Sequence, residues 1–256
     1  MKMSDEFLKI FHEVSSSHNP SKIYEEWLDY VIDINLLQLE SQDLDFQGRE
    51  ADYFRLFESW IKIMNDKIHT EKLEGTDYGH AGKDWYDYLG YFYQNHIQSQ
   101  SGKQGSGSFY TPANVCSSMA EMTLVSTEDY KDKLIRDPCC GSGRMLLAGH
   151  SFAPEAIFIG GDLDLIAVKQ TVLNFWIHGV TGSVCHMDGI TDEFMEGWKV
   201  NQYLNHGLPV PHIEKVYSYE EAVYFFGRNT KSPEEYNIKD EIDVVKTKKT
   251  VQSTLI

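Results

Sequence analysis

The sequence predicts an α/β fold in which a mostly parallel, doubly wound sheet follows an α-helical N-terminal region. The hydrophobic pattern has a helical period up to about residue 98, and beyond residue 130 short apolar runs alternate with helical stretches. Such alternation is typical of a parallel sheet, because a helix returns the chain to the edge where the next strand starts. The Gly/Ser-rich segment QSQSGKQGSGS, at 98–108, separates the two patterns as a candidate boundary or mobile loop.

Three amphipathic stretches account for the helical region. Residues 20–40, 49–68 and 83–97 each repeat large apolar side chains at intervals of three or four, which predicts helices with one buried face. Asn19 followed by Pro20 is a typical helix start. We interpret the many aromatic residues on these faces as helical core.

The second part of the chain predicts three strands, at 134–137, 156–162 and 183–189, with helices at 144–152 and 165–179 between them. Beyond residue 192 the pattern is weaker. There we expect a helix, an extended loop, a strand and a loosely ordered tail, at 193–204, 206–221, 222–227 and 231–256 respectively.

The composition limits the classes of partner. The formal net charge of −16 disfavours a free-standing nucleic-acid-binding protein, because contacts to phosphates need a basic surface. A local basic face, or a partner that provides one, remains compatible with this charge. The N-terminus is charged and amphipathic without a signal-peptide core, and no apolar run approaches the roughly 20 residues of a membrane span. We therefore expect a cytoplasmic protein.

The turn DPCCGSGRMLLAG, at 137–149, is the most unusual stretch, and it could be a metal site, a redox pair, a phosphate-binding loop or a cofactor loop. The four cysteines show no CxxC spacing, adjacent cysteines rarely form a disulfide, and no further zinc ligands lie nearby. A P-loop would need Gly-Lys-Ser/Thr, whereas Arg144 follows Gly143 here. Reduced thiols in a cofactor loop remain, and no metal site is expected.

Acidic residues at the predicted strand ends indicate which cofactor this loop would bind. Asp137, Asp162 and Asp188 each end a strand, and ligands of such sheets bind outside the carboxyl ends of the strands. Asp162 would bind a ribose diol and Asp188 an adenine amine, and the free N–H groups of the helix that follows the turn would favour a small anionic group. This combination fits S-adenosylmethionine, whereas a dinucleotide would more commonly show the G-x-G-x-x-G motif, which is missing. Taken alone, the motif would also fit a plain glycine-rich turn between a strand and a helix.

Motif order adds a family resemblance. The sequence resembles adenine-N6 DNA methyltransferases over about residues 84–190, and particularly the modification subunit of type I restriction systems and related phage and plasmid methylases. DYLGYFYQN, at 87–95, is similar to the helical lead-in of that family. The motifs that carry the resemblance are GSFYTPANVCSSM (107–119), DPCCGSGRMLLAG (137–149), GGDLDLIAVKQTVLN (160–174) and MDG (187–189).

The resemblance implies a Rossmann-like, S-adenosylmethionine-dependent methyltransferase fold and a role for each motif. The FYTP segment would pack against the methionine part of the cofactor, and the turn after Asp137 would lie beneath it. Leu163 would touch the adenine. For Asp164 and His186 we ourselves favour structural roles. The expected cofactor-binding residues are Phe109, Tyr110, Thr111, Pro112, Asp137, Pro138, Cys139, Gly141, Ser142, Gly143, Asp162, Leu163, Asp188, Gly189 and Ile190.

The sequence departs from the family where the methyl acceptor should bind. In the family, Asn, Asp or Ser followed by Pro-Pro-aromatic comes after the fourth strand and holds the target amine of a flipped base. The chain has seven prolines and no two are adjacent; NHGLPVPHI, at 205–213, offers Asn205 and spaced prolines, and we interpret it as a surface loop. The stretch after Asp188 is also short for a complete sheet, so we expect an incomplete one and assign no catalytic residue.

Three functions therefore remain open. The first is an S-adenosylmethionine-binding member of the adenine-N6 DNA methyltransferase family. The second is a catalytically silent subunit or regulator, for example of a restriction-modification system, and the third is a methyltransferase with an unrecognised acceptor site. Expected partners are DNA, a protein subunit that provides recognition, or a second copy of the chain, and no membrane. We expect a helical region at 1–105, a methyltransferase-like cofactor-binding domain at 106–230, and the tail at 231–256.

Overall fold

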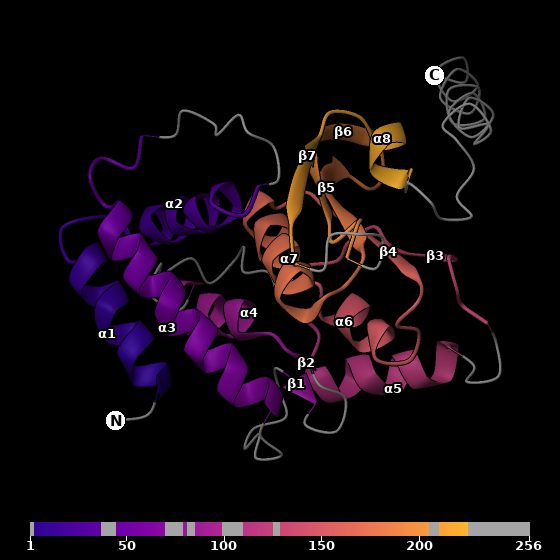
Figure 1. The fold of residues 1–256 in the computed structure, drawn as a ribbon, viewed down its shortest axis with the longest axis horizontal. Coiled ribbons are helices and arrows are strands. Elements are labelled where there is room, and N and C mark those ends of the chain that lie inside the picture. The colour runs from indigo at the N-terminus through magenta and orange to yellow at the C-terminus, as the bar shows by residue number, and fades with distance from the viewer. Residues whose placement is uncertain are drawn as a thin grey trace, which may run out of the picture.

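A five-stranded sheet with helices packed on it forms one side of the molecule, and the N-terminal helices form the other (Figure 1). Helix α7 lies between the two, in contact with α2 on one side and with β4 and β5 on the other. The computed structural model describes residues 3–36, 45–69, 79–80, 85–98, 110–124, 129–204 and 210–224.

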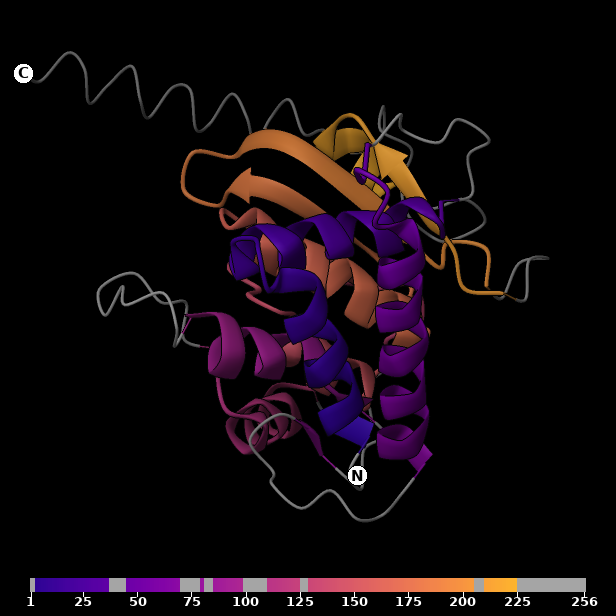
Figure 2. The ribbon, with the colours of Figure 1, turned by 90° about the vertical axis from the view of Figure 1, so that its left-hand side faces the viewer.

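The N-terminal helices confirm the predicted amphipathic stretches. Helix α2 starts as expected, because the Asn19 side chain accepts a hydrogen bond from the backbone N–H of Ser21 at 2.9 Å and Pro20 occupies the first turn. Figure 2 shows α1 and α3 lying side by side. The aromatic residues of this region are packed together and buried, with Trp27 and Trp60 fully inaccessible. The three helices are α1 (Met3–Ser15), α2 (Pro20–Asp33) and α3 (Glu50–His69).

A short irregular segment connects these helices to the sheet. The predicted helix at 83–97 is confirmed only from Tyr88 onward, because Trp85 and Tyr86 instead pair with Gly79 and His80 as two antiparallel strands. The elements are β1 (Gly79–His80), β2 (Trp85–Tyr86), α4 (Tyr88–Phe92), the π-helix η1 (Tyr93–Gln98) and, beyond residue 109, α5 (Ala113–Thr123).

The predicted parallel strands are confirmed. Strands β3, β4 and β5 are parallel neighbours, connected through α6 and α7, and α7 ends at Gly179 in a left-handed conformation with φ of 68°. The sheet has the order β3-β4-β5-β6-β7. Its elements are β3 (Leu134–Asp137), α6 (Arg144–His150), β4 (Ile157–Asp162), α7 (Leu165–His178), β5 (Gly182–Asp188), β6 (Glu193–Val200) and β7 (Ile213–Val216).

The structure corrects the predictions beyond residue 192. Residues 193–200 form strand β6, antiparallel to β5, and not a helix, because Asp192 at φ of 56° lets the chain reverse into a hairpin. The expected loop contains strand β7, which is antiparallel to β6. The prediction of a strand at 222–227 is wrong for the residues that the structure describes, because Ala222 and Val223 end helix α8 (Tyr219–Val223). Ser218 starts this helix by accepting a hydrogen bond from the N–H of Glu221.

The N-terminal helices and the sheet share one hydrophobic core. Lys169 of α7 is only 4% exposed and forms ion pairs with Glu25 and Asp29 of α2. At the β7 edge, Leu36 forms a parallel bridge to Ile213. Three predictions lie outside the described residues: most of the Gly/Ser-rich segment, both domain boundaries and the tail at 231–256. Among the helices that are described, none is long and apolar enough to cross a membrane.

Candidate functional site

The three parallel strands place an aspartate each at the same edge of the sheet. Asp137 is the last residue of β3, Asp162 of β4 and Asp188 of β5, as the sequence predicts. Because carboxyl ends of parallel strands share one edge, these three carboxylates and the turn after β3 lie at the same edge of the sheet. We call this set of strand ends the carboxyl edge.

The turn after β3 is held by one backbone hydrogen bond to the neighbouring strand and by one within the turn. The N–H of Cys140 donates to the carbonyl of Gly161 at 2.9 Å, and the N–H of Gly143 donates to the carbonyl of Cys140 at 2.8 Å. Gly141 and Gly143 have φ of 55° and 84°, which favours glycine at both positions. The turn is therefore tight, as the sequence predicts, and α6 begins directly after it.

Asp162 connects the end of β4 to this turn. Its Oδ2 accepts a hydrogen bond from the N–H of Gly141 at 2.8 Å, and its Oδ1 accepts one from the N–H of Asp164 at 2.9 Å. Each carboxylate oxygen can accept a second hydrogen bond, so both can still receive a hydroxyl group. The pKa of Asp137 is raised overall, because burial and the nearby Asp162 carboxylate raise it more than the hydrogen bond from the N–H of Cys139 lowers it.

Two exposed apolar side chains flank the carboxyl edge. Leu163, directly after β4, is 64% exposed, and Ile190, after β5, is 92% exposed. Asp188 orders the second loop, because its Oδ1 accepts hydrogen bonds from the N–H groups of Ile190 and Thr191. Gly189 passes so close to the turn that a Cβ would lie 2.8 Å from the carbonyl oxygen of Pro138. The loops after β3 and β5 thus meet across the end of β4.

The Tyr110 ring packs against the turn after β3. A Cβ on Gly141 would lie 2.9 Å from Cδ1 of the Tyr110 ring, and the Arg144 guanidinium carbon lies 5.4 Å from the ring centroid. Burial raises the pKa of Tyr110 well above its usual range, so its hydroxyl stays protonated and donates to Oε1 of Gln170 at 2.7 Å. Thr111 and Pro112 are exposed at the start of α5, and Phe109 lies outside the described residues.

A fully buried carboxylate behind the turn escaped the sequence prediction. Asp87 Oδ2 accepts hydrogen bonds from Ser142 Oγ and Arg144 Nε, both at 2.6 Å. Its Oδ1 accepts from the N–H of Gly90 and from Asn174 Nδ2, both at 2.8 Å. The Ser142 side chain therefore points inward to Asp87, and its backbone is the part that belongs to the turn. The one sequence signal was Asp87 three residues before Gly90, the spacing of a helix N-cap.

The cysteines differ sharply in exposure. All four are free thiols, and Cys139 is exposed whereas Cys116, Cys140 and Cys185 are buried. Burial raises the pKa of Cys116 to about 11 and that of Cys185 to about 12. The buried thiols therefore act as small core side chains.

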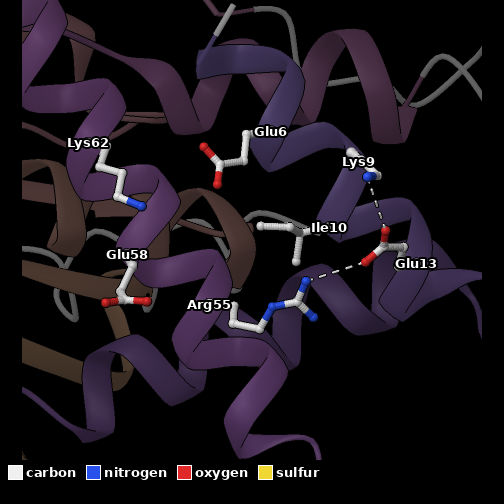
Figure 3. Close-up of a pocket in the computed structure, with 7 residues that line it drawn as sticks. All are labelled: Glu6, Lys9, Ile10, Glu13, Arg55, Glu58 and Lys62. Atoms are coloured by element: carbon white, nitrogen blue, oxygen red, sulfur yellow. Dashed lines mark hydrogen bonds and ion pairs between the residues drawn. The ribbon is translucent and has the colours of Figure 1, made fainter. Parts of the chain in front are cut away.

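A separate cavity of about 280 Å³ lies between α1 and α3 (Figure 3). Glu13 forms ion pairs there with Lys9 at 4.0 Å and with Arg55 at 3.5 Å. Acidic and basic side chains are equally represented, and none of the predicted site residues lines it, so we interpret it as a solvated groove. The lining residues are Glu6, Lys9, Ile10, Glu13, Arg55, Glu58 and Lys62.

Strand β6, which follows β5 in the chain, runs away from the carboxyl edge. Because β6 is antiparallel to β5, Val200 at its end pairs with Gly182 at the start of β5. Asn201 follows, fully buried, and its Nδ2 donates to the carbonyls of Phe175 and Val180 while its Oδ1 accepts from the N–H of His212. Asn201 thus holds the opposite edge of the sheet together. Asn205 lies outside the described residues.

Comparison with known proteins agrees with the resemblance. Residues 84–203 match the N-6 DNA Methylase family. The chain is 29% identical over 180 residues to the type I restriction enzyme MjaVIII methylase subunit of Methanocaldococcus jannaschii, an alignment that covers 68% of this chain and 28% of the relative. No solved structure shows a significant match. The region 84–203, which carries the parallel strands, their terminal aspartates and the glycine turn, thus matches the adenine-N6 DNA methyltransferase family.

Proposed function

We propose that the chain binds S-adenosylmethionine at the carboxyl edge of β3, β4 and β5. The observation that supports this best is the pairing of exposed apolar and acidic side chains there. Leu163 and Ile190 offer apolar surface to a purine, next to the carboxylates of Asp162 and Asp188. An adenine ring has the size and shape to cover two apolar side chains that stand beside hydrogen-bonding carboxylates.

The remaining parts of the cofactor find matching groups at the same edge of the sheet. The free acceptor positions of Asp162 suit the ribose hydroxyls, and Asp188 suits the adenine amine. The turn at 138–143 and the ring of Tyr110 are left for the methionine part. When bound, the cofactor supplies an activated methyl group, and the side chains of this chain bind and orient it.

In this proposal the activity is methyl transfer to the adenine amine of DNA, as in restriction-modification, with a partner subunit or a second copy of the chain contributing DNA recognition and the acceptor group. The relative is named as a subunit, and the chain spans 28% of its length. A net charge of −16 also suits a protein that meets DNA through a partner better than one that binds DNA alone.

A second candidate is a catalytically silent S-adenosylmethionine-binding subunit or regulator. The hairpin from β5 into β6 favours this candidate, because the chain leaves the carboxyl edge after Asp188. The side chain of Asn201 forms its hydrogen bonds at the opposite edge of the sheet. Strand β7 runs back toward this edge and ends at Val216, but the described residues after it, up to Tyr224, contain no proline and so no Pro-Pro-aromatic motif.

Titration calorimetry with S-adenosylmethionine tests the binding site. Asp162→Asn removes one acceptor and the charge, so affinity should fall by about 10- to 100-fold, the range of a hydrogen bond to a charged group. Asp164→Asn is the matched control, because asparagine also caps a helix and Asp164 caps α7. Its affinity should stay within about threefold of wild type. Equal affinities in wild type and Asp162→Asn would contradict the site.

Transfer of tritium from labelled cofactor to mixed-sequence DNA separates the two candidates. We expect no incorporation by the isolated chain, because its sequence has no two adjacent prolines and therefore no Pro-Pro-aromatic acceptor motif. Incorporation above that of the Asp162→Asn variant would refute the silent candidate. Binding without incorporation, restored by an added subunit, would support the first proposal.

A further inference from the structure

The orientation of Tyr110 depends on a side chain that cannot itself contact a ligand. Gln170 of α7 is fully buried, and its Oε1 accepts the hydrogen bond from the Tyr110 hydroxyl at 2.7 Å. Its Nε2 donates to the hydroxyl of Tyr24 at 3.1 Å and lies 3.5 Å from the carbonyl of Leu89. Both ends of this amide are therefore occupied, which fixes the amide plane.

The anchor behind Gln170 is itself rigid. Tyr24 of α2 has no exposed surface and donates its own hydroxyl proton to the carbonyl of Leu89 at 3.1 Å. The hydrogen bonds thus run from the start of the 88–98 helical segment, through Tyr24 and Gln170, to the ring that covers Gly141. A partly exposed tyrosine held at its hydroxyl in this way has few orientations left.

We propose that Gln170 is a positioning residue that holds the Tyr110 ring over the turn and thereby sets the affinity for the methionine part of the ligand. This inference rests on the proposed function. The ring lies on the turn, whereas the apolar side chains suited to the purine, Leu163 and Ile190, follow β4 and β5. Gln170 therefore acts on one end of the ligand and leaves the adenosine end untouched.

Two substitutions break the contact from opposite sides. Gln170→Met keeps the length of the side chain and removes the acceptor, and Tyr110→Phe keeps the ring and removes the donor. Each releases the ring into other rotamers, so S-adenosylmethionine affinity should fall about three- to tenfold in each variant, the cost of ordering one side chain on binding. Because both remove the same interaction, the double variant should be no weaker than the weaker single one.

Adenosine is the probe that separates positioning from a general structural defect. It lacks the methionine part, so its affinity should be unchanged in Gln170→Met. Gln202→Met is the matched control, since Gln202 is also buried, at 4% exposure, but follows β6 at the opposite edge of the sheet. It should leave the affinity for both probes unchanged.

The outcomes of this calorimetric series are distinct. Loss of affinity for S-adenosylmethionine alone, non-additive with Tyr110→Phe, supports the inference. Equal loss for both probes, or additive losses in the double variant, would overturn it. If Gln170→Met fails to fold, a wild-type affinity for S-adenosylmethionine in Tyr110→Phe would overturn it as well. If the wild-type chain binds neither probe, the proposed function fails and this inference fails with it, whereas unchanged binding in both single variants overturns the inference alone.

Discussion

Replacing Asp87 by asparagine should destabilise the protein more than any exposed acidic substitution. Its side chain is fully buried and accepts four hydrogen bonds, and the Arg144 side chain that it neutralises is only 4% exposed. Asparagine has a single acceptor oxygen and places an NH₂ group against donors. A buried guanidinium without its counter-charge costs about 3–5 kcal/mol, and we expect a loss of unfolding free energy of that size.

Urea denaturation followed by tryptophan fluorescence measures this loss. The matched control is Asp52→Asn, because Asp52 pairs with Arg55 at 3.0 Å but the two side chains are 45% and 51% exposed. Surface pairs of this kind contribute less than about 1 kcal/mol. A loss below about 1 kcal/mol in Asp87→Asn, equal to that of the control, would refute the role assigned to the buried pair.

A double-mutant cycle shows whether the unpaired charge causes the loss. Arg144→Met removes the guanidinium, so Asp87→Asn should cost much less in that background than in wild type. Additive losses would mean that the hydrogen bonds to Ser142, Gly90 and Asn174 dominate instead.

Two further predictions concern acid and thiol chemistry. Burial lowers the pKa of His150 and His178 to about 4, so their contribution to stability is complete above the unfolded value near 6.5 and is lost as pH falls toward 4. Each can contribute up to about 3 kcal/mol, and an unfolding free energy that stays level between pH 7 and pH 5 would contradict this. Second, Cys139 should be the one thiol of four that reacts with Ellman's reagent in the folded protein, and bound S-adenosylmethionine should slow it. Rapid reaction of more than one thiol in the native state, or an unchanged rate with ligand in a chain that binds it, would count against the placement of this turn.

The sequence could predict the elements whose signals are local. The strands ending at Asp137, Asp162 and Asp188 are short apolar runs followed by a turn or a helix start, so pattern and spacing suffice for them. The segment at 193–200 could not be assigned in this way, because its inner half is buried on both faces and loses the alternation of a half-exposed strand. Pairing with β5 determines its conformation, and pairing is a non-local property.

The same limit applies to the site. The glycines and aspartates of the carboxyl edge stand in recognisable motifs, whereas Asp87 precedes α4 and Gln170 lies within α7, both in stretches whose pattern predicts ordinary helical core. Their partners are distant in the sequence: Ser142 and Arg144 for Asp87, Tyr24 and Tyr110 for Gln170. Only the packing of α4, α6 and α7 reveals that these polar groups are satisfied by one another and stand behind the turn.

The bridge from Leu36 to Ile213 has a consequence for biosynthesis. The first three helices leave the ribosome early, yet surfaces that they bury are completed by α7 and β7, as in the stacking of Trp60 on Trp176 at 6.2 Å. Contacts between such distant parts of a chain form slowly, and until they form the aromatic faces remain open to other hydrophobic surfaces. The nascent N-terminal half should therefore depend on chaperones, and fragments that stop before residue 165 should aggregate when expressed alone.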